Sequence, residues 1–247
     1  MIRQPLLALT LALAALPALA IDSMPLNPTA ATAAAEDPQA GQVAEIIRIS
    51  GLIGLSEQAR NIAQQVLNTQ AAPVGQQYDV VDRLSKRWSP QALQSGFSRV
   101  LDNFSSADRA QLQSVLASRQ LVNLRQKEQE AISHQGTAAY VSYVQRLRTQ
   151  PPAPARLALI KELDQAMQFS ALMNLTRAQV YPQLQAVLSG WQPPASWQND
   201  LNRQVQEFLL YVHRTTPNDE LQRLIQTYRQ PVVQAWLSGV KRQLSAG

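Results

Sequence analysis

Apolar residues recur every three to four positions through most of this chain, which is the period of an α-helix. The clearest run is Trp197, Leu201, Val205, Phe208 and Val212. Such spacing gives a helix one apolar stripe that must be buried against other helices. Ala, Leu, Gln and Arg, all good helix formers, are frequent, whereas β-branched and aromatic residues are thinly spread. The sequence therefore predicts an all-α fold, a multi-helix bundle.

Hydroxyl side chains mark several helix starts. Ser89 and Thr216 each precede a proline, which suits the first position of a helix because its missing N–H is no loss there. Ser106 and Ser196 are expected to cap the helices that follow them. The helix after Ser106 is predicted to continue to about Ile132, because the apolar period is unbroken over that range.

Glycines and prolines interrupt the helical patterns. Gly51 and Gly54 either kink one helix or separate two. Pro182 and Pro231 lie within apolar periods and are each expected to bend a helix, because proline removes a backbone hydrogen bond.

A proline-rich stretch, Pro151-Pro152-Ala153-Pro154, is the strongest candidate boundary in the chain. It predicts one helical unit over residues 42–150 and a second over 151–247. Residues 112–116 resemble residues 221–225, which fits two similar units in tandem. Amphipathic helices also produce such similarity by chance, so duplication and coincidence both remain open.

The first twenty residues have the order of a signal peptide. Arg3 supplies the positive charge, residues 6–16 are apolar, and Ala18-Leu19-Ala20 has the small side chains of a cleavage site. We expect residues 1–20 to be removed after Ala20 and the protein to reach the periplasm or the exterior. The apolar run is shorter than the roughly 20 residues that span a bilayer, and no later stretch matches it, so an integral membrane protein is not expected.

Residues 21–41 are predicted to be a disordered tether. Pro25, Pro28 and Pro38 interrupt an Ala/Thr-rich run that offers no large apolar side chain to a core. The chain contains no cysteine, so neither a disulfide nor a thiol-linked lipid can stabilise or anchor it.

Charge gives little information about partners. The formal net charge is +5, evenly scattered, which is compatible with weak attraction to anionic envelope polymers. Arg83, Lys86 and Arg87 precede Trp88 and could form a basic patch, but such a tryptophan is more often a core anchor. No nucleic-acid partner is predicted.

No catalytic or metal-binding constellation is present. His134 and His213 have no second histidine or cysteine at ligand spacing, and both are interpreted as surface or helix-terminal side chains. Phosphate-binding loops and nucleophile elbows are absent, so no metal, cofactor or catalytic residue is predicted. Single glutamates are interpreted as parts of solvated helix faces. They are Glu45, Glu57, Glu128, Glu130, Glu162 and Glu207.

The stretch over residues 218–235 resembles the closing motif of a bacterial exported family of unknown function. In that motif an acidic-Leu stretch leads to an aromatic pair and then to Ser-Pro-x-Gly-Gln. Tyr228, Pro231 and Gln234 stand in register with it, while Gln230 and Val233 replace the serine and the glycine. The resemblance implies a helical, exported domain without cysteine, and the family has no established catalytic residues to transfer.

Aromatic residues near the two prolines suggest a binding surface. Tyr181, Tyr228 and Trp236 lie on or beside the bends expected at Pro182 and Pro231, where a bent helix would leave an apolar groove. Tyr181, Tyr228, Pro231 and Trp236 are therefore the candidate binding residues. The functional hypothesis is a non-enzymatic module of the cell envelope that takes a peptide, a lipid or a partner protein. The alternative is a hydrolase of cell-wall polymers that acts with a single acidic residue.

Overall fold

The structure, a computed structural model, describes residues 38–246. The predicted signal peptide, 1–20, and residues 21–37 of the predicted tether lie outside this range. Every regular element within 38–246 is a helix and none is a strand, which confirms the all-α prediction. The first helix already includes residues 38–41, so the predicted end of the tether was placed too late.

Most of the helices precede the proline-rich stretch at 151–154. These are α1 (Pro38–Ser50), the short 3₁₀ helix η1 (Leu52–Gly54), α2 (Leu55–Thr69), α3 (Val74–Trp88), α4 (Pro90–Leu101), α5 (Ser106–Leu116), α6 (Arg119–His134) and α7 (Ala138–Thr149). The helices that follow it are α8 (Pro154–Met167), α9 (Phe169–Gln185), α10 (Trp197–Val212), α11 (Asn218–Tyr228) and α12 (Pro231–Ser245).

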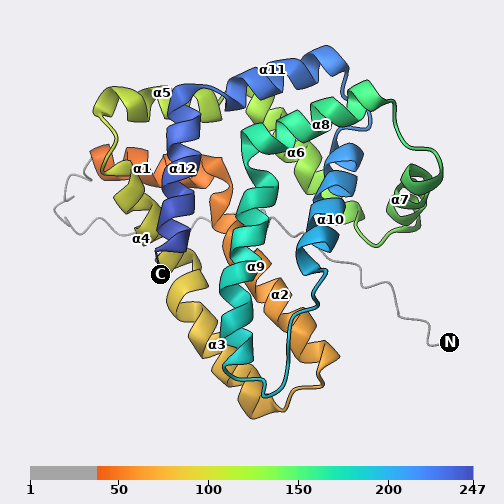
Figure 1. Ribbon diagram of the computed structural model, residues 1–247. Coiled ribbons are helices and arrows are strands. Elements are labelled where there is room, and N and C mark those ends of the chain that lie inside the picture. Colours follow the sequence, from red (N-terminus) through yellow and green to blue (C-terminus); the bar gives the residue numbers. More distant parts are fainter. Residues whose placement is uncertain (1–37, 247) are drawn as a thin grey trace, which may run out of the picture.

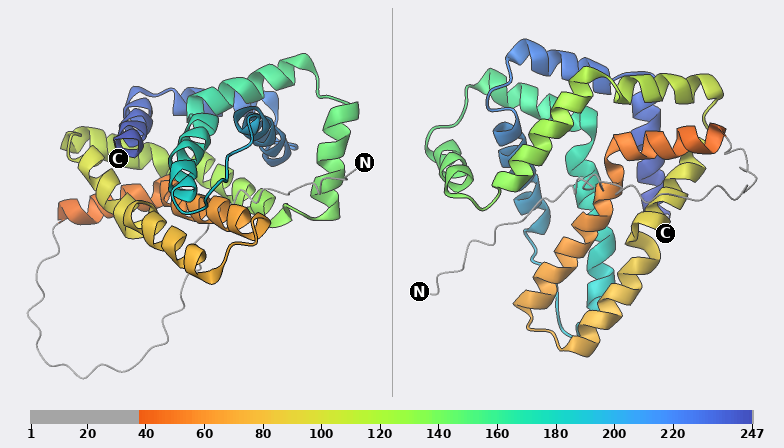
Figure 2. Two further views of the ribbon diagram at one scale, coloured as in Figure 1. Left: turned by 60° about the horizontal axis from the view of Figure 1, so that its bottom comes forward. Right: turned by 180° about the vertical axis from the view of Figure 1, so that it is seen from behind.

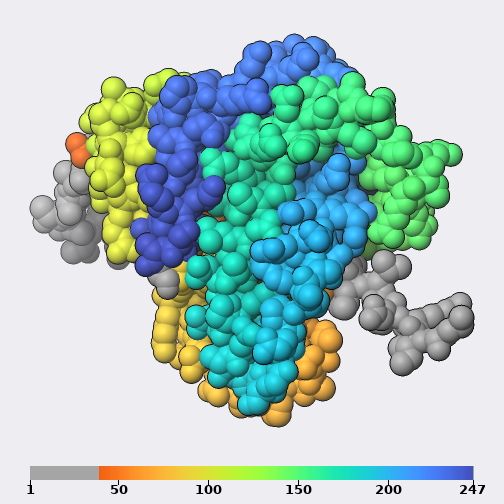
Figure 3. All heavy atoms as spheres, in the orientation of Figure 1, coloured from red at the N-terminus to blue at the C-terminus, as the bar shows by residue number. Residues whose placement is uncertain are grey.

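Helix α9 is the centre of the fold. It packs against α2, α3, α8, α10 and α12, and Figure 3 shows it running down one face of the molecule between α12 and α10. Apolar side chains on several sides of α9 are buried, because neighbours surround it. Helices α8 and α11 lie together across one end of the molecule (Figure 1).

Helices from the two sides of the proline-rich stretch pack directly on each other. Helix α12 contacts α4 and α5, α10 contacts α6 and α7, and α2 and α3 contact α9 (Figures 1 and 2). Their buried apolar side chains form one continuous core.

A hydroxyl side chain caps the start of three helices. The Ser89 hydroxyl accepts a hydrogen bond from the backbone N–H of Ala92 at 3.2 Å, with Pro90 at the first helical position. At α5 the cap is Ser105, which accepts from the N–H of Asp108 at 3.1 Å, rather than the predicted Ser106. Thr137 caps α7 in the same way.

Several predicted long helices are broken by one or two residues. Gly51, at φ 73°, ends α1, so the glycines separate two helices rather than kink one. The helix predicted to reach Ile132 is divided into α5 and α6 by Ala117 and Ser118. Gln168, at φ 54°, separates α8 from α9. The apolar residues keep their three-to-four-residue spacing across these breaks, so the sequence pattern alone does not reveal where one helix ends and the next begins.

The two prolines differ in position. Pro182 lies inside α9, near its C-terminal end, as predicted. Pro231 does not bend a helix, which corrects the sequence interpretation: α11 ends at Tyr228, and Pro231 is the first residue of α12. A proline at that position loses no hydrogen bond and favours the helical φ.

The apolar stripe of α10 is buried largely as expected. Leu201, Val205 and Phe208 are almost completely inaccessible. Trp197, at the first position, is only half-buried because it lies at the helix end. Ser196 does not cap this helix through its side chain; its hydroxyl instead donates to the Asp200 carboxylate at 2.6 Å.

Candidate functional site

A small pocket lies where the segment joining α1 to α2 meets α6, α9, α11 and α12. Its volume is about 110 Å³, close to the roughly 150 Å³ of an engineered apolar cavity that binds benzene. In the view from behind in Figure 2, α1 and α6 lie in front of α9 and α12. The apolar lining is Leu52, Leu55, Leu116, Met167, Phe169, Leu172, Met173, Val233, Trp236 and Leu237.

Trp236 is the largest side chain of the apolar wall and is fixed in place. It is 1% exposed and packs edge-on against Phe97 of α4, with 5.9 Å between ring centroids. Its indole N–H has no hydrogen-bond partner among the described residues. The α12–α4 contact therefore holds one wall of the pocket rigid.

The polar wall consists of Arg125, Glu128 and Gln129 from α6 together with Tyr228 from α11. Arg125 is held by a hydrogen bond that its Nη2 donates to the carbonyl oxygen of Leu116 at 2.8 Å. No hydrogen bond or ion pair to Glu128 is found within residues 38–246, and none to the Tyr228 hydroxyl. These two side chains retain their hydrogen-bonding capacity.

Burial changes the acidity of both groups. Desolvation raises the pKa of the Glu128 carboxyl from 4.5 to about 7, against a smaller opposing effect of Arg125. Desolvation also raises the pKa of Tyr228, with a further contribution from Glu128. Near neutral pH, Glu128 is thus present in both protonation states while Tyr228 keeps its proton.

Gln234 holds in place the junction between α11 and α12, where Tyr228 lies. Its side-chain amide donates to the carbonyl oxygens of Tyr228 and Ala166, each at 2.7 Å. Its oxygen accepts a hydrogen bond from the Gln168 amide at 2.9 Å. One side chain of α12 therefore ties together the end of α11, the end of α8 and the start of α9.

The structure brings together two of the four candidate binding residues. Tyr228 and Trp236 line the same pocket. Pro231 starts α12 and is not part of the lining. Tyr181 lies near the far end of α9, about 18 Å along the helix from Phe169, and packs edge-on against Trp191 and Trp197 with centroids 5.4 and 5.3 Å away.

Sequence reasoning missed Arg125 and Glu128 as pocket residues. Glu128 was interpreted as part of a solvated face, yet it continues the stripe formed by the buried residues Leu121, Leu124 and Ala131. A carboxylate at an inward position of an apolar stripe is the signal that could have identified it. Arg125 gave no comparable signal, because long side chains often cover apolar surface.

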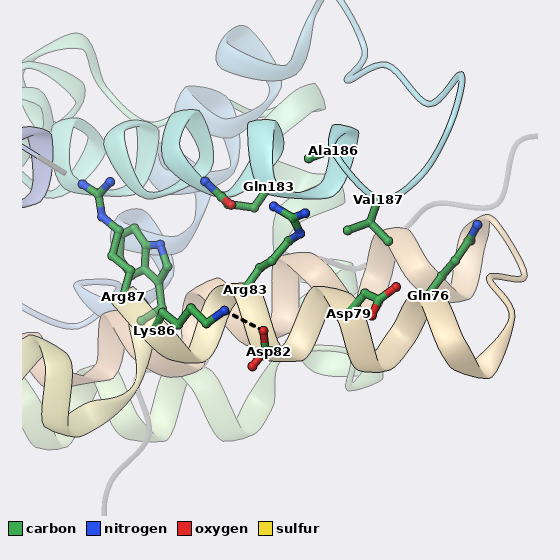
Figure 4. Close-up of a pocket in the computed structure, with 10 residues that line it drawn as sticks. Gln76, Asp79, Asp82, Arg83, Lys86, Arg87, Gln183, Ala186 and Val187 are labelled. Atoms are coloured by element: carbon green, nitrogen blue, oxygen red, sulfur yellow. Dashed lines mark ion pairs between the residues drawn. The ribbon is translucent and has the colours of Figure 1, made fainter.

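A larger hollow, of about 730 Å³, lies between α3 and α9 (Figure 4). It contains the basic side chains of Arg83, Lys86 and Arg87, and two carboxylates, those of Asp79 and Asp82, offset most of their charge. Lys86 pairs with Asp82 at 2.8 Å, and Arg87 donates to the Gln179 side chain and to the carbonyl of Leu244. Trp88 is buried, as a core anchor would be. This surface is therefore less suited to selective binding than the small pocket.

The two histidines serve the packing of helix ends. His134 lies 3.0 Å from the Tyr211 hydroxyl. His213 is the C-terminal cap residue of α10, so it is helix-terminal as interpreted from the sequence, but it is completely buried rather than at the surface. Burial, together with Lys127 and Arg156, lowers the pKa of His213 to about 3, so it is neutral.

Neither a metal site nor a membrane span is found in the described part of the chain. No three His, Cys, Asp or Glu side chains within residues 38–246 are grouped closely enough to hold a metal ion. None of the helices there combines the length and apolar character that crossing a bilayer requires. Comparison of the chain with protein-family models, curated proteins and solved structures gave no match.

Proposed function

We propose that this chain is an exported, non-enzymatic binding module of the cell envelope, and that the pocket between α6, α9 and α12 is its ligand site. The supporting observation is the composition of the pocket. An apolar wall formed by residues such as Phe169 and Trp236 faces a polar wall on which Glu128 and Tyr228 have no partner within the described residues. Binding sites typically combine such a lining with a few polar groups.

The size of the pocket limits what it can accept. A volume of about 110 Å³ is enough for one aromatic ring or a short alkyl chain. A whole helix or an extended peptide would not fit, although the apolar end of a longer ligand would.

Methionine methyl NMR tests the proposal directly. The methionines within residues 38–246 are Met167 and Met173, and both line the pocket. Titration with phenethyl alcohol, a neutral probe with one ring, is expected to shift both of their methyl resonances. Unshifted Met167 and Met173 resonances at saturating probe would contradict the proposal.

Two neighbouring substitutions provide a matched control. Leu52 and Ile53 are adjacent half-buried residues of η1, but only Leu52 lines the pocket. Leu52→Trp should fill the pocket and abolish the shifts, whereas Ile53→Trp should preserve them. Equal binding by the two variants would place the probe elsewhere.

Export has its own test. Cleavage after Ala20 predicts that the protein recovered from the periplasm or the medium begins at Ile21. Recovery of protein that still begins at Met1 would remove the export part of the proposal.

One observation favours the alternative of a hydrolase. A carboxyl group with a raised pKa in an apolar pocket, as at Glu128, has the property required of a general acid. The small volume argues against a polymeric substrate. Digestion of purified cell wall by the wild type, lost in Glu128→Gln, would favour the hydrolase over the binding module.

A further inference from the structure

The polar wall of the pocket carries one permanently charged side chain, Arg125, and one carboxyl group that can lose its charge, Glu128. Arg125 is anchored to the carbonyl of Leu116 and keeps its positive charge across the physiological pH range. Glu128, one helical turn further along α6, has no ion-pair partner within the described residues. The pocket therefore contains a fixed cation beside a carboxyl group that can be neutral.

The charged and titratable groups of residues 38–246 that interact with Glu128 come from two helices. Arg125 lies on α6 and Tyr228 on α11. Arg48 of α1 acts on Arg125 rather than on Glu128, and its own charge is paired with Glu45 at 2.6 Å. The pocket lining contributed by α9 and α12 is apolar. Apart from Glu128, no acidic side chain of residues 38–246 lines this wall to oppose a negative ligand group.

We propose that the ligand is a small monocarboxylic acid whose apolar part, one ring or a short alkyl chain, lies against Trp236 and Phe169 while its carboxylate pairs with Arg125. Protonated Glu128 and the Tyr228 hydroxyl donate hydrogen bonds to the same carboxylate. This inference rests on the proposed function and names the ligand class of the same pocket.

Charge balance explains why an acid is preferred to an amine. With a carboxylate bound and Glu128 protonated, the buried site is neutral overall, with a hydrogen-bonded pair of opposite charges. An amine would leave two cations beside one carboxylate in a largely apolar pocket, where an unpaired charge is costly.

Three probes that share a ring and differ in the head group separate these cases: phenylacetate, phenethyl alcohol and phenethylamine. Calorimetric titration at about pH 6, where Glu128 is mostly protonated, should give the order acid, alcohol, amine from tightest to weakest. The affinity for phenylacetate should fall about tenfold between about pH 6 and about pH 8, because only the protonated form of Glu128 is competent to bind.

Two variants identify the residues responsible. Glu128→Gln keeps a hydrogen-bond donor of similar shape, so its affinity for phenylacetate should not change over the same pH range. Arg125→Gln should lose the preference for acid over alcohol while still binding phenethyl alcohol, which also shows that the variant is folded.

The outcomes distinguish this inference from the proposed function. Binding of phenethyl alcohol in the pocket without a preference for the acid, or with an amine bound more tightly, overturns the inference and leaves the binding module intact. A wild-type pH profile identical to that of Glu128→Gln also overturns it. Failure of all three probes to bind overturns both.

Discussion

At the scale of single residues, Glu128 and His213 make stability depend on pH in opposite directions. The folded chain holds the Glu128 proton up to about pH 7, whereas the unfolded chain releases it near 4.5, so stability falls as the pH rises through that interval. Folded His213 stays neutral down to about pH 3, whereas the unfolded histidine gains a proton near 6.5, so stability falls as the pH drops through that interval.

The two effects oppose each other between pH 4.5 and 6.5, and single substitutions should separate them. Urea unfolding of His213→Asn should show stability decreasing with pH relative to the wild type, and Glu128→Gln should show it increasing. The slope difference is at most about 1.4 kcal/mol per pH unit, and less for Glu128, whose surface is partly open to the pocket. If stability depended on pH in the same way in the wild type and both variants, the burial of Glu128 and His213 described above would be contradicted.

Only some of the pocket residues could be predicted from the sequence. Tyr228 and Trp236 were predicted from their aromatic character near a proline, and they do share a pocket, but Tyr181 was selected by the same argument and lies elsewhere. Proximity to a proline does not determine which helices meet. The position of Glu128 on an apolar stripe was visible in the sequence, but its partners across the pocket depend on tertiary packing.

At the scale of helices, the crossing of α12 over α4 depends on Gly239. A Cβ at this position would lie 2.4 Å from Cγ1 of Val100, whose β-branched side chain cannot easily move away. The close approach of these helices is what positions Trp236 against Phe97.

Gly239→Ala should therefore destabilise the fold by about 1 to 3 kcal/mol, as overpacking does. Adding Val100→Ala should remove most of that penalty, measured against Val100→Ala alone in a double-mutant cycle. Gly41, in α1 with no atom near its missing Cβ, is the matched control, and Gly41→Ala should stabilise by about 0.5 to 1 kcal/mol. Additive effects of the Gly239 and Val100 substitutions would show that the two residues do not clash.

The existence of helices was easier to predict than their ends. Ser89-Pro90 combines a capping hydroxyl with a proline, and the helix starts there as predicted. Gln168 adopts a left-handed conformation, and α5 ends with Ala117 as its C-cap, but neither break alters the apolar period. Pro231 was placed inside a helix because the period continues across the α11–α12 junction.

At the scale of the whole molecule, the helices on the two sides of residues 151–154 share a core. The sequence could indicate the break in the chain at the prolines, but not that α12 would return to pack on α4. Contacts between helices far apart in the chain depend on which apolar faces the other helices leave uncovered. A single sequence does not specify which of those faces pack together.

This arrangement predicts that the chain unfolds as one cooperative unit. Tryptophan fluorescence reports on Trp88 from one side of the proline-rich stretch and on Trp191, Trp197 and Trp236 from the other, whereas far-UV circular dichroism reports on all helices. The two signals should give the same denaturant midpoint. Two separate transitions would instead indicate independent units at 42–150 and 151–247.

If the pocket beside Trp236 and Glu128 is a ligand site, a crystal of the protein with para-bromophenylacetate should show where the ligand binds. We expect one anomalous bromine peak among the apolar residues that line the pocket, including Phe169 and Trp236, with the ligand carboxylate near Arg125 and Glu128. A bromine peak only in the hollow between α3 and α9, or at a lattice contact, with the pocket unoccupied, would show that the pocket is not the ligand site.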